Sequence, residues 1–292
     1  MSIRYYHEDR GNSDTTRDDT KFFRMNKYGR LVEINPSLAG AHLYLGVEWE
    51  TDDYYGYGEA EEASDYVDDT FGRFCHCEHD GSLDCGFEIV TNPMTLAAHR
   101  AAHWEQMFDE LQSSWNAQAN DTRTCGMHVH VSRAALGNDP EARYKCIAKI
   151  LELVERFESE LSCVARRKIA DCDWCSPTGY GHDLNDSARD MVRKAHRVQD
   201  EQGLGCHDGE RYHAVNLQNV NTIEFRIFKG TLDSTAAYAT LALVDGLVRW
   251  CKQHTSIETH AVTWNGLLDW ISDETLTTYW GRRVPYLYRY TY

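Results

Sequence analysis

Apolar and polar residues alternate in four short stretches of this chain. These stretches are 42–50, 86–89, 126–131 and 222–228. In the first stretch, Leu45, Val47 and Trp49 would share one face of a strand. Glu48 and Glu50 would point the other way, because successive residues of a strand face opposite sides. The four stretches therefore predict strands of one sheet that has an apolar face and a polar face.

The polar face gathers residue types that bind metals and phosphates. By the same alternation, it also carries Glu88, His128, His130, Glu224 and Arg226. An ordinary exposed strand face favours Lys, Thr and mixed charges. Carboxylate oxygens suit hard cations such as Mg²⁺ or Mn²⁺, and a guanidinium suits a phosphate oxygen. The face therefore indicates a site for phosphoryl transfer, with a structural Arg–Glu salt bridge as the ordinary alternative.

Helical periodicity occupies much of the chain between these strands. Helices are predicted from Thr95 to about Trp115, from Asp139 to about Leu161, from Ser234 and from Thr263. Further strands are expected at 73–78, 85–90 and about 211–218, with a short hairpin near 22–33. Residues 51–70 contain eight Asp or Glu and no Lys or Arg, which favours a solvated acidic loop or a fraying helix. This order predicts an α+β fold, with one mostly antiparallel sheet and helices on its apolar face.

Composition and charge narrow the function classes. At 292 residues, 42% of them hydrophobic, the chain is long enough to bury a sizeable core. Its net charge of −16 argues against non-specific binding to nucleic acid or an anionic membrane, because the overall field repels both. The sequence contains no apolar run long enough for a membrane span.

The ten cysteines suggest a reducing compartment. Residues 1–27 are polar and lack the apolar core of a secretory signal, so we expect a cytoplasmic protein with free thiols. The alternative is a structural Zn²⁺ site in which the fold unites Cys75 and Cys77 with Cys172 and Cys175.

Four segments resemble the motifs of the amidoligase family, in the family's order. They are Gly46-Val47-Glu48-Trp49-Glu50, then Asp80-Gly81-Ser82-Leu83 with Glu88-Ile89-Val90, then Cys125-Gly126-Met127-His128-Val129-His130-Val131, and last Arg211-Tyr212 to Asn216-Leu217 with Thr222-Ile223-Glu224-Phe225-Arg226 and Gly230-Thr231-Leu232. Each motif is weak alone, and four in order are specific. The resemblance covers roughly residues 42–250.

The resemblance implies a carboxylate–amine ligase with a fold related to glutamine synthetase and glutamate–cysteine ligase. Such a fold is a curved antiparallel sheet whose concave face holds ATP and divalent metals, Mg²⁺ or Mn²⁺. The implied reaction activates a carboxylate as an acyl phosphate, which an amine then converts to an amide or isopeptide. Residues 41–292 would form the catalytic domain, and residues 1–40 an N-terminal arm or small hairpin.

The resemblance also implies roles for individual residues. The implied metal ligands are Glu48, Glu50, Glu88, His128, His130 and Glu224. The implied nucleotide-binding residues are Glu50, Glu88, Arg166, Arg167, Asn216 and Arg226. Arg226 would stabilise charge on the transferring phosphoryl group, and Glu48 and Glu224 would complete the catalytic set.

Two other functions remain open from the sequence. A zinc-dependent hydrolase could use His128, His130 and a Glu, although the excess of carboxylates speaks against it. A non-catalytic binding protein could retain the ligase fold. For a ligase, the partners would be a carboxylate and an amine, carried by amino acids, peptides or proteins, and the sequence does not indicate an oligomeric state.

Overall fold

Strands and helices alternate along most of the chain in the computed structural model, which describes residues 4–5, 20–38, 42–120, 122–168, 214–217, 219, 221–254 and 258–291. The strands are β1 (Arg4–Tyr5), β2 (Phe22–Met25), β3 (Leu31–Ile34), β4 (Leu45–Thr51), β5 (Cys75–His79), β6 (Phe87–Thr91), β7 (Gly126–Ser132), β8 (Val215–Asn216) and β9 (Thr222–Lys229). The helices are α1 (Tyr57–Phe71), α2 (Leu96–Ala101), α3 (Trp104–Trp115), α4 (Pro140–Arg156), α5 (Glu158–Ala165), α7 (Ser234–Gln253), α8 (Trp264–Ile271) and α9 (Glu274–Arg283).

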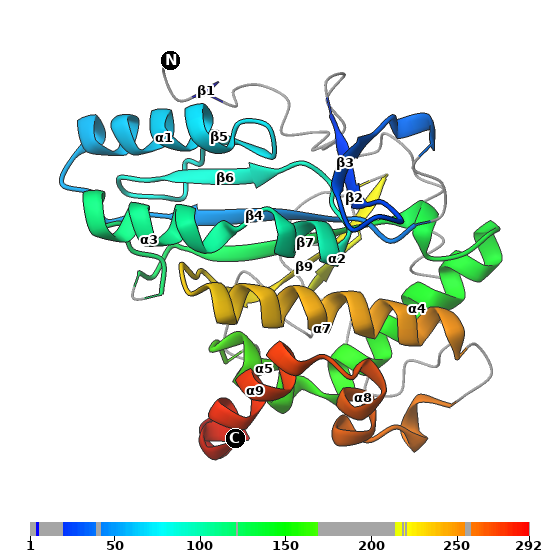
Figure 1. Cartoon of the computed structure of the whole chain (residues 1–292). Helices are drawn as coiled ribbons and strands as arrows, with labels where there is room; N and C mark the ends of the chain where they lie inside the picture. Colours follow the sequence, from blue (N-terminus) through cyan, green and yellow to red (C-terminus); the bar gives the residue numbers. More distant parts are fainter. Residues whose placement is uncertain are drawn as a thin grey trace.

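One sheet organises the described part of the chain. Its strand order is β1-β5-β6-β4-β7-β9-β8, and β2 and β3 form a separate hairpin. Every neighbouring pair in the sheet is antiparallel except β1 and β5. The predicted α+β class with a mostly antiparallel sheet is therefore confirmed. The segments with alternating polarity supply the adjacent strands β6, β4, β7 and β9 (Figure 1).

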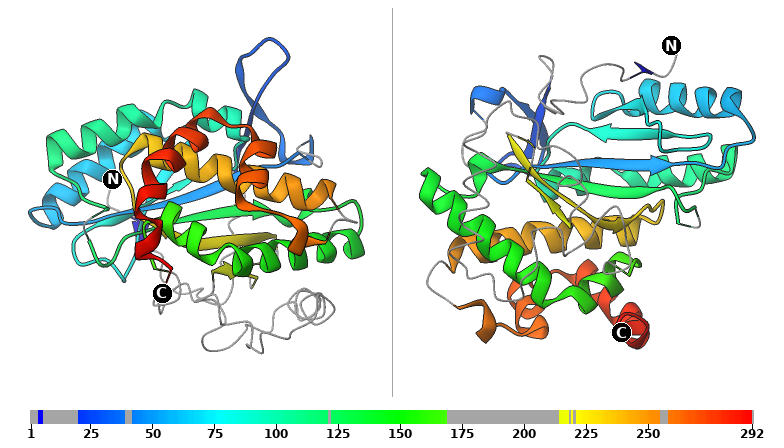
Figure 2. Two further views of the ribbon diagram at one scale, coloured as in Figure 1. Left: turned by 90° about the horizontal axis from the view of Figure 1, so that it is seen from below. Right: turned by 180° about the vertical axis from the view of Figure 1, so that it is seen from behind.

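Helices α1, α2, α3 and α7 cover one face of this sheet (Figures 1 and 2). The core lies between them and the strands, where the Trp49 ring meets the rings of Trp104 and Phe108 edge-on, each at a centroid distance of 5.2 Å. Leu45, Val47 and Trp49 are all fully buried there. The alternation in β4 thus places its apolar side chains under the helices and leaves Glu48 and Glu50 on the opposite face.

Most of the acidic segment is the ordered helix α1, which begins at Tyr57, so our expectation of a solvated loop or fraying helix for 51–70 was wrong there. In α1, Ala60, Ala63 and Val67 recur at helical spacing and are fully buried. The ring of Phe71, at the end of the helix, lies 6.1 Å from that of Trp104. Burial of this apolar stripe against the core stabilises a helix whose remaining sides are rich in acidic residues, because tertiary packing supplies most helical stability.

The helix predicted from Thr95 to Trp115 is two helices. Thr95 caps the first as expected, since its hydroxyl accepts a hydrogen bond from Ala98 N. The chain then turns at His103, which is left-handed with φ 58°, and α3 starts in a new direction. The helix predicted from Asp139 to about Leu161 is also divided, at Phe157, into α4 and α5.

The N-terminal hairpin predicted near residues 22–33 is the β2–β3 pair. Phe23 is fully buried, and its backbone N–H donates to Pro93 O, so β2 is attached to the main core. The predicted strand at 211–218 is described only at 214–217, where β8 pairs with β9. None of the helices that the structure describes is long and apolar enough to span a bilayer.

Candidate functional site

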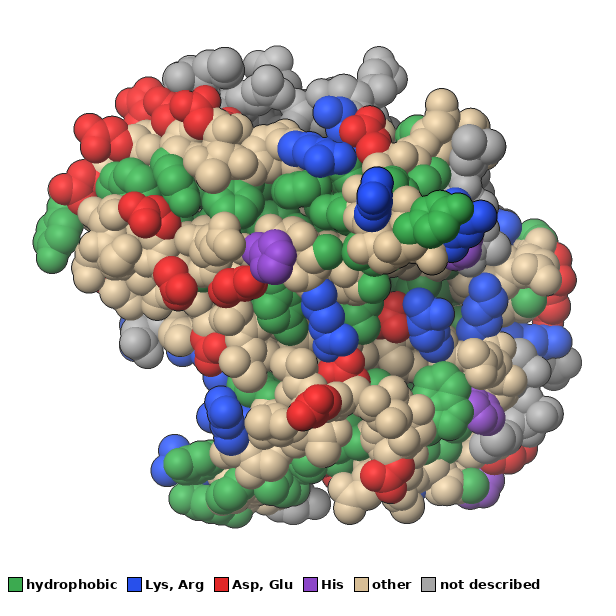
Figure 3. Space-filling model, viewed as in Figure 1, with side chains coloured by type: hydrophobic (Ala, Val, Ile, Leu, Met, Phe, Trp, Pro, Cys, Tyr) green, Lys and Arg blue, Asp and Glu red, His purple; other side chains and the backbone are tan. Residues whose placement is uncertain are grey.

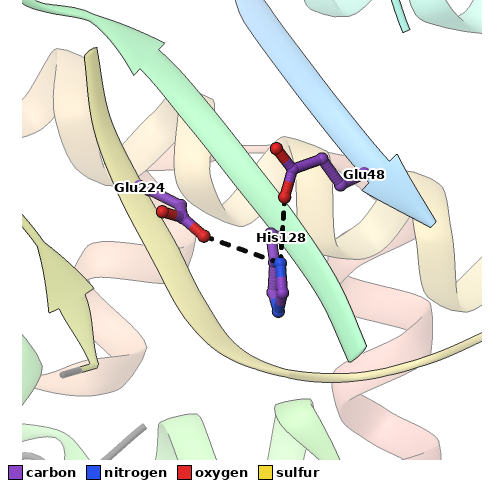
Figure 4. Close-up of side chains that lie close together, drawn as sticks. All are labelled: Glu48, His128 and Glu224. Carbon is purple, nitrogen blue, oxygen red and sulfur yellow. Dashed lines mark hydrogen bonds and ion pairs between the residues drawn. The ribbon is translucent and has the colours of Figure 1, made fainter. Parts of the chain in front are cut away.

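Three adjacent strands bring one imidazole and two carboxylates together. Glu48 of β4 is opposite His128 of β7 in the strand register, and Glu224 comes from β9 on the other side of β7. His128 Nδ1 lies 3.0 Å from Glu48 Oε2 and 3.5 Å from Glu224 Oε1 (Figure 4). The two carboxylates therefore approach the same ring nitrogen from neighbouring strands.

Residues on the same strands extend this cluster. His130 Nε2 lies 2.8 Å from Glu48 Oε1, so Glu48 contacts both imidazoles through different oxygens. Arg226 Nη1 forms an ion pair with Glu224, whose other oxygen accepts a hydrogen bond of 2.8 Å from Asn216 Nδ2. The cluster is a continuous network across β4, β7, β9 and β8.

Gly126 permits the close approach of Glu50 to His128. The Gly126 backbone N–H donates to the Glu50 carboxylate. A Cβ at position 126 would lie 2.8 Å from His128 Nε2 and 3.3 Å from Glu50 Oε2. His128 Nε2 and Glu50 Oε1 are 3.8 Å apart. A side chain at 126 would therefore displace either the imidazole or the carboxylate, which accounts for glycine at this position.

A bulge between β7 and β9 lies at Arg226, which strand alternation already places on the same face as Glu224. The register passes from Met127↔Phe228 to Val129↔Phe225, so β9 has one extra residue opposite His128. Such a bulge re-aims side chains without ending the strand pairing. Arg226 Nε is buried and has no hydrogen-bond partner among the described residues. One edge of the guanidinium is thus bound to Glu224, and its Nε is a buried donor without a partner among the described residues.

Charge pairing divides the buried carboxylates into two groups. Burial alone would raise the pKa of Glu48, but His130 and His128 outweigh it and lower that pKa well below the usual range. Burial also opposes ionisation of Glu224, yet Arg226 and His130 lower its pKa. Burial disfavours the charged form of His130, but Glu48 and Glu224 raise its pKa to about 9. Ionised Glu48 and Glu224 therefore face a positively charged His130 at neutral pH.

The pKa values of Glu88 and Glu50 are raised, in contrast to those of Glu48 and Glu224. They are in register across β6 and β4. Burial raises the pKa of Glu88 well above its usual range, and the nearby charges of Glu48 and Glu50 add to this effect. Burial also raises the pKa of Glu50, against the attraction of His128. This side of the cluster has more carboxylates than cations, and a bound divalent cation would relieve the excess.

The donor set suits a hard divalent cation. Ligand atoms of Glu48, His128 and Glu224 lie within 4.8 Å of one another, a spacing that a metal ion can bridge. Two carboxylates and one imidazole match Mg²⁺ or Mn²⁺ better than a structural zinc. Glu50 and Glu88 lie in neighbouring register positions and would supply further oxygens. The residues present therefore fit the metal expected from the sequence.

Arg166 and Arg167 lie at the margin of the site. Arg166 donates to Asn120 Oδ1 at 2.7 Å and to Gly230 O at 3.0 Å, and Arg167 donates to Cys125 O at 3.0 Å. These contacts join the segment before β7 to the turn after β9. The structure therefore brings Asn216 into the cluster and places the two arginines against the loops that flank it. Tyr212 lies outside the described residues.

The proposed zinc site receives no support from the thiols that are described. Cys75 and Cys77 are buried beneath α1, where their sulfurs donate to the carbonyls of Phe71 and Ser64. Burial raises the pKa of both thiols well above the usual range, which disfavours the thiolate that zinc requires. Cys172 and Cys175 lie outside the described residues. Among the residues that are described, the group that could hold a metal contains no thiol.

Sequence reasoning missed two residues next to the cluster. Thr222 Oγ1 lies 3.3 Å from His130 Nδ1, so it orients the ring whose other nitrogen contacts Glu48. Tyr44 has the same strand parity as Gly46 and Glu48 and lines a cavity beside them. Parity could have identified Tyr44, whereas the Thr222 contact depends on the register between β7 and β9.

Comparisons with known proteins identify the family of this chain. Residues 59–248, more than half of the chain, match the family model described as "Putative amidoligase enzyme". Solved structures with a match include "Apo GmaS without ligand", at 13% identity and a TM-score of 0.46, over 85% of this chain and 69% of that one. A likeness at this level carries no functional argument. No curated protein matches the chain.

Proposed function

This chain belongs to the amidoligase family, and from that premise we propose that it is an ATP- and divalent-metal-dependent carboxylate–amine ligase. Family membership supports the general reaction, the joining of a carboxylate to an amine. The observation that carries the finer proposal is the group of half-buried Glu48 with buried His128 and Glu224, whose ligand atoms lie within 4.8 Å of one another, and the pairing of Arg226 to Glu224. Metal ligands beside an arginine are typical of sites for phosphoryl transfer, where both stabilise the charge of the transferring group.

The proposed reaction has two steps. A carboxylate oxygen of the substrate attacks the γ-phosphorus of ATP, the bond to the bridging oxygen breaks, and ADP leaves. The amine nitrogen then attacks the carbonyl carbon of the acyl phosphate, the C–O bond to phosphate breaks, and the nitrogen loses a proton. The products are an amide, ADP and inorganic phosphate.

The residues of the chain would divide the work between them. Glu48, His128 and Glu224, with Glu50 and Glu88 beside them, would hold a metal that neutralises phosphate charge when bound, and His130 would orient Glu48 through its other oxygen. Arg226 would donate its Nε–H to an oxygen of the transferring phosphoryl group, and its pairing with Glu224 fixes the plane of the guanidinium. Asn216 holds the second Glu224 oxygen, so the carboxylate is oriented from both sides.

The zinc-hydrolase alternative is not favoured by the geometry. Among the described residues, the group that can converge on one metal contains a single imidazole and two carboxylates. His128 and His130 contact opposite oxygens of Glu48. Their positions suit a carboxylate held between two rings.

Metal and nucleotide binding to the native protein tests the proposal. Mg²⁺ or Mn²⁺ with ATP should raise the melting temperature, because a ligand that binds the native state stabilises it. Glu48→Gln should abolish this shift while the far-ultraviolet circular dichroism of the protein stays unchanged. Glu61→Gln, on the exposed side of α1, is the matched control and should keep the full shift. A full shift in Glu48→Gln would remove Glu48 from the binding site.

A further inference from the structure

A cavity of about 390 Å³ lies beside the carboxylate–imidazole cluster. Glu48 and His130 line it, together with Gly46 and Tyr44 on the same face of the sheet. Its lining also includes residues of α1 and of the segment around β2. The ligase mechanism above uses the side of this cavity that carries Glu48 and leaves the α1 side without a role.

The α1 side of the cavity is acidic. Asp65, Asp68 and Asp69 line it, and their spacing places them on one face of the helix. Lys21 is the one Lys or Arg among the described lining residues. Acidic side chains gather over the α1 end of the molecule in general (Figure 3). This charge would repel a nucleotide phosphate and attract a cation.

Asp68 also has a structural task. Asp68 Oδ1 accepts a hydrogen bond of 2.9 Å from the backbone N–H of Cys77, which ties α1 to β5. Asp65 is half-buried and Asp69 is exposed. Substitution of Asp65 or Asp69 therefore changes the charge of the cavity wall and leaves this tie in place.

A second and independent observation points to a ligand in the same cavity. Tyr44 is 2% exposed, and its hydroxyl has no hydrogen-bond partner among the described residues. The ring itself is well packed, with Phe22 edge-on at a centroid distance of 5.0 Å. Buried hydroxyl groups are normally paired. A bound molecule with an N–H group would supply the missing partner at Tyr44.

We propose that this cavity binds the amine substrate, and that the α1 aspartates select an amine carrying a second positive charge. The inference rests on the proposed ligase function. The nitrogen that attacks an acyl phosphate must be uncharged, so it cannot also be the cation that the aspartates attract. The recognised substrate is therefore a diamine or a basic amino-acid amine, with one nitrogen near Glu48 and a separate ammonium or guanidinium near Asp65 and Asp69.

Binding of simple amines, measured by calorimetry without ATP, tests this assignment. The probes are 1,5-diaminopentane, pentylamine and 6-aminohexanoate, which share a chain of similar length and differ in the far group. We expect the diamine to bind at least about tenfold more tightly than the other two, because only the diamine can place one nitrogen near Glu48 and an ammonium beside the two aspartates at the same time. Equal affinity for all three amines would overturn the proposal.

Variants locate the effect within the cavity. Asp65→Asn with Asp69→Asn should remove the preference for the diamine. Glu61→Gln with Glu62→Gln, on α1 but outside the cavity lining, should keep it. Tyr44→Phe should weaken diamine binding and leave the melting temperature of the free protein unchanged, since the hydroxyl has no partner to lose among the described residues. A preference that survives in the double Asp variant would contradict the assignment.

The two proposals can fail separately. A protein that binds the diamine selectively but shows no shift with metal and ATP would contradict the ligase function and retain the cationic pocket. A protein that shifts with metal and ATP but binds all three amines alike would retain the ligase function and contradict the pocket.

Discussion

At the scale of single residues, Arg226 offers two separate donors in one plane, an arrangement that lysine cannot reproduce. Its Nη1 pairs with Glu224, and its buried Nε is left for a ligand. Arg226→Lys keeps the charge but loses the planar arrangement of donors. We expect kcat to fall by about a hundredfold and the KM for ATP to change by less than about threefold, because the lost donor acts on the transition state.

The measurement is ADP release with the carboxylate and amine that give the fastest turnover in a screen. Arg249→Lys is the matched control, since Arg249 pairs with Asp245 on α7, away from the cluster. It should leave both constants unchanged. A loss of ATP affinity as large as the loss of turnover in Arg226→Lys would assign Arg226 to ground-state binding, and AMP as the nucleotide product would overturn the acyl-phosphate route.

At the scale of helices and strands, α4 offers a test of local stabilisation away from the site. Asp139 is its N-cap and accepts a hydrogen bond of 2.8 Å from Ala142 N, and Pro140 occupies the first turn. Asp139→Ala should lower the free energy of unfolding by about 1 kcal/mol, because one helical N–H loses its acceptor. Urea unfolding monitored by circular dichroism measures the change.

Two comparisons make this result specific to capping. Asp139→Ser retains an oxygen acceptor and should recover most of the lost stability. The thermal shift with metal and ATP should be the same in both variants as in the wild type, since α4 contributes no residue to the cluster. A Ser variant as unstable as the Ala variant would assign the effect to the charge of Asp139 instead.

At the scale of the whole molecule, His99 couples the pH of the medium to global stability. It is fully buried, its Nε2 lies 3.0 Å from Leu45 O, and its Nδ1 accepts from Trp104 Nε1. The ring is therefore neutral and links β4, α2 and α3. Burial lowers its pKa to about 4, against the support of the Leu45 carbonyl.

The sign of the effect follows from proton uptake. Between pH 6.5 and pH 4 the unfolded chain binds a proton at His99 that the folded protein excludes, so stability falls as the pH falls. The slope from this residue is at most about 1.4 kcal/mol per pH unit. In His99→Gln, the amide keeps a donor and an acceptor but does not titrate, and urea unfolding at pH 7.5 and pH 5 should show a smaller loss. An equal loss in variant and wild type would refute this role.

Much of the site was predictable because the two-residue period of a strand reads directly from the sequence. Glu48, His128 and Glu224 share the polar face for that reason alone. The helix caps at Thr95 and Asp139 were predictable in the same way, since they depend on neighbours within four residues. Local rules of this kind need no knowledge of the rest of the fold.

Only the tertiary structure determined the features that depend on contacts between distant segments. The β4–β7 register sets Glu48 against His128, and the β8–β9 register sets Asn216 against Glu224. The sequence of helix α1 predicted a loop because its many acidic residues outnumber the small apolar ones. The helix is stable because α3 and β5 bury the stripe that those small residues form. The cavity joins Tyr44 of one strand edge to Asp65 of that helix, and no local pattern relates the two. Such contacts depend on packing between distant segments, which periodicity does not encode.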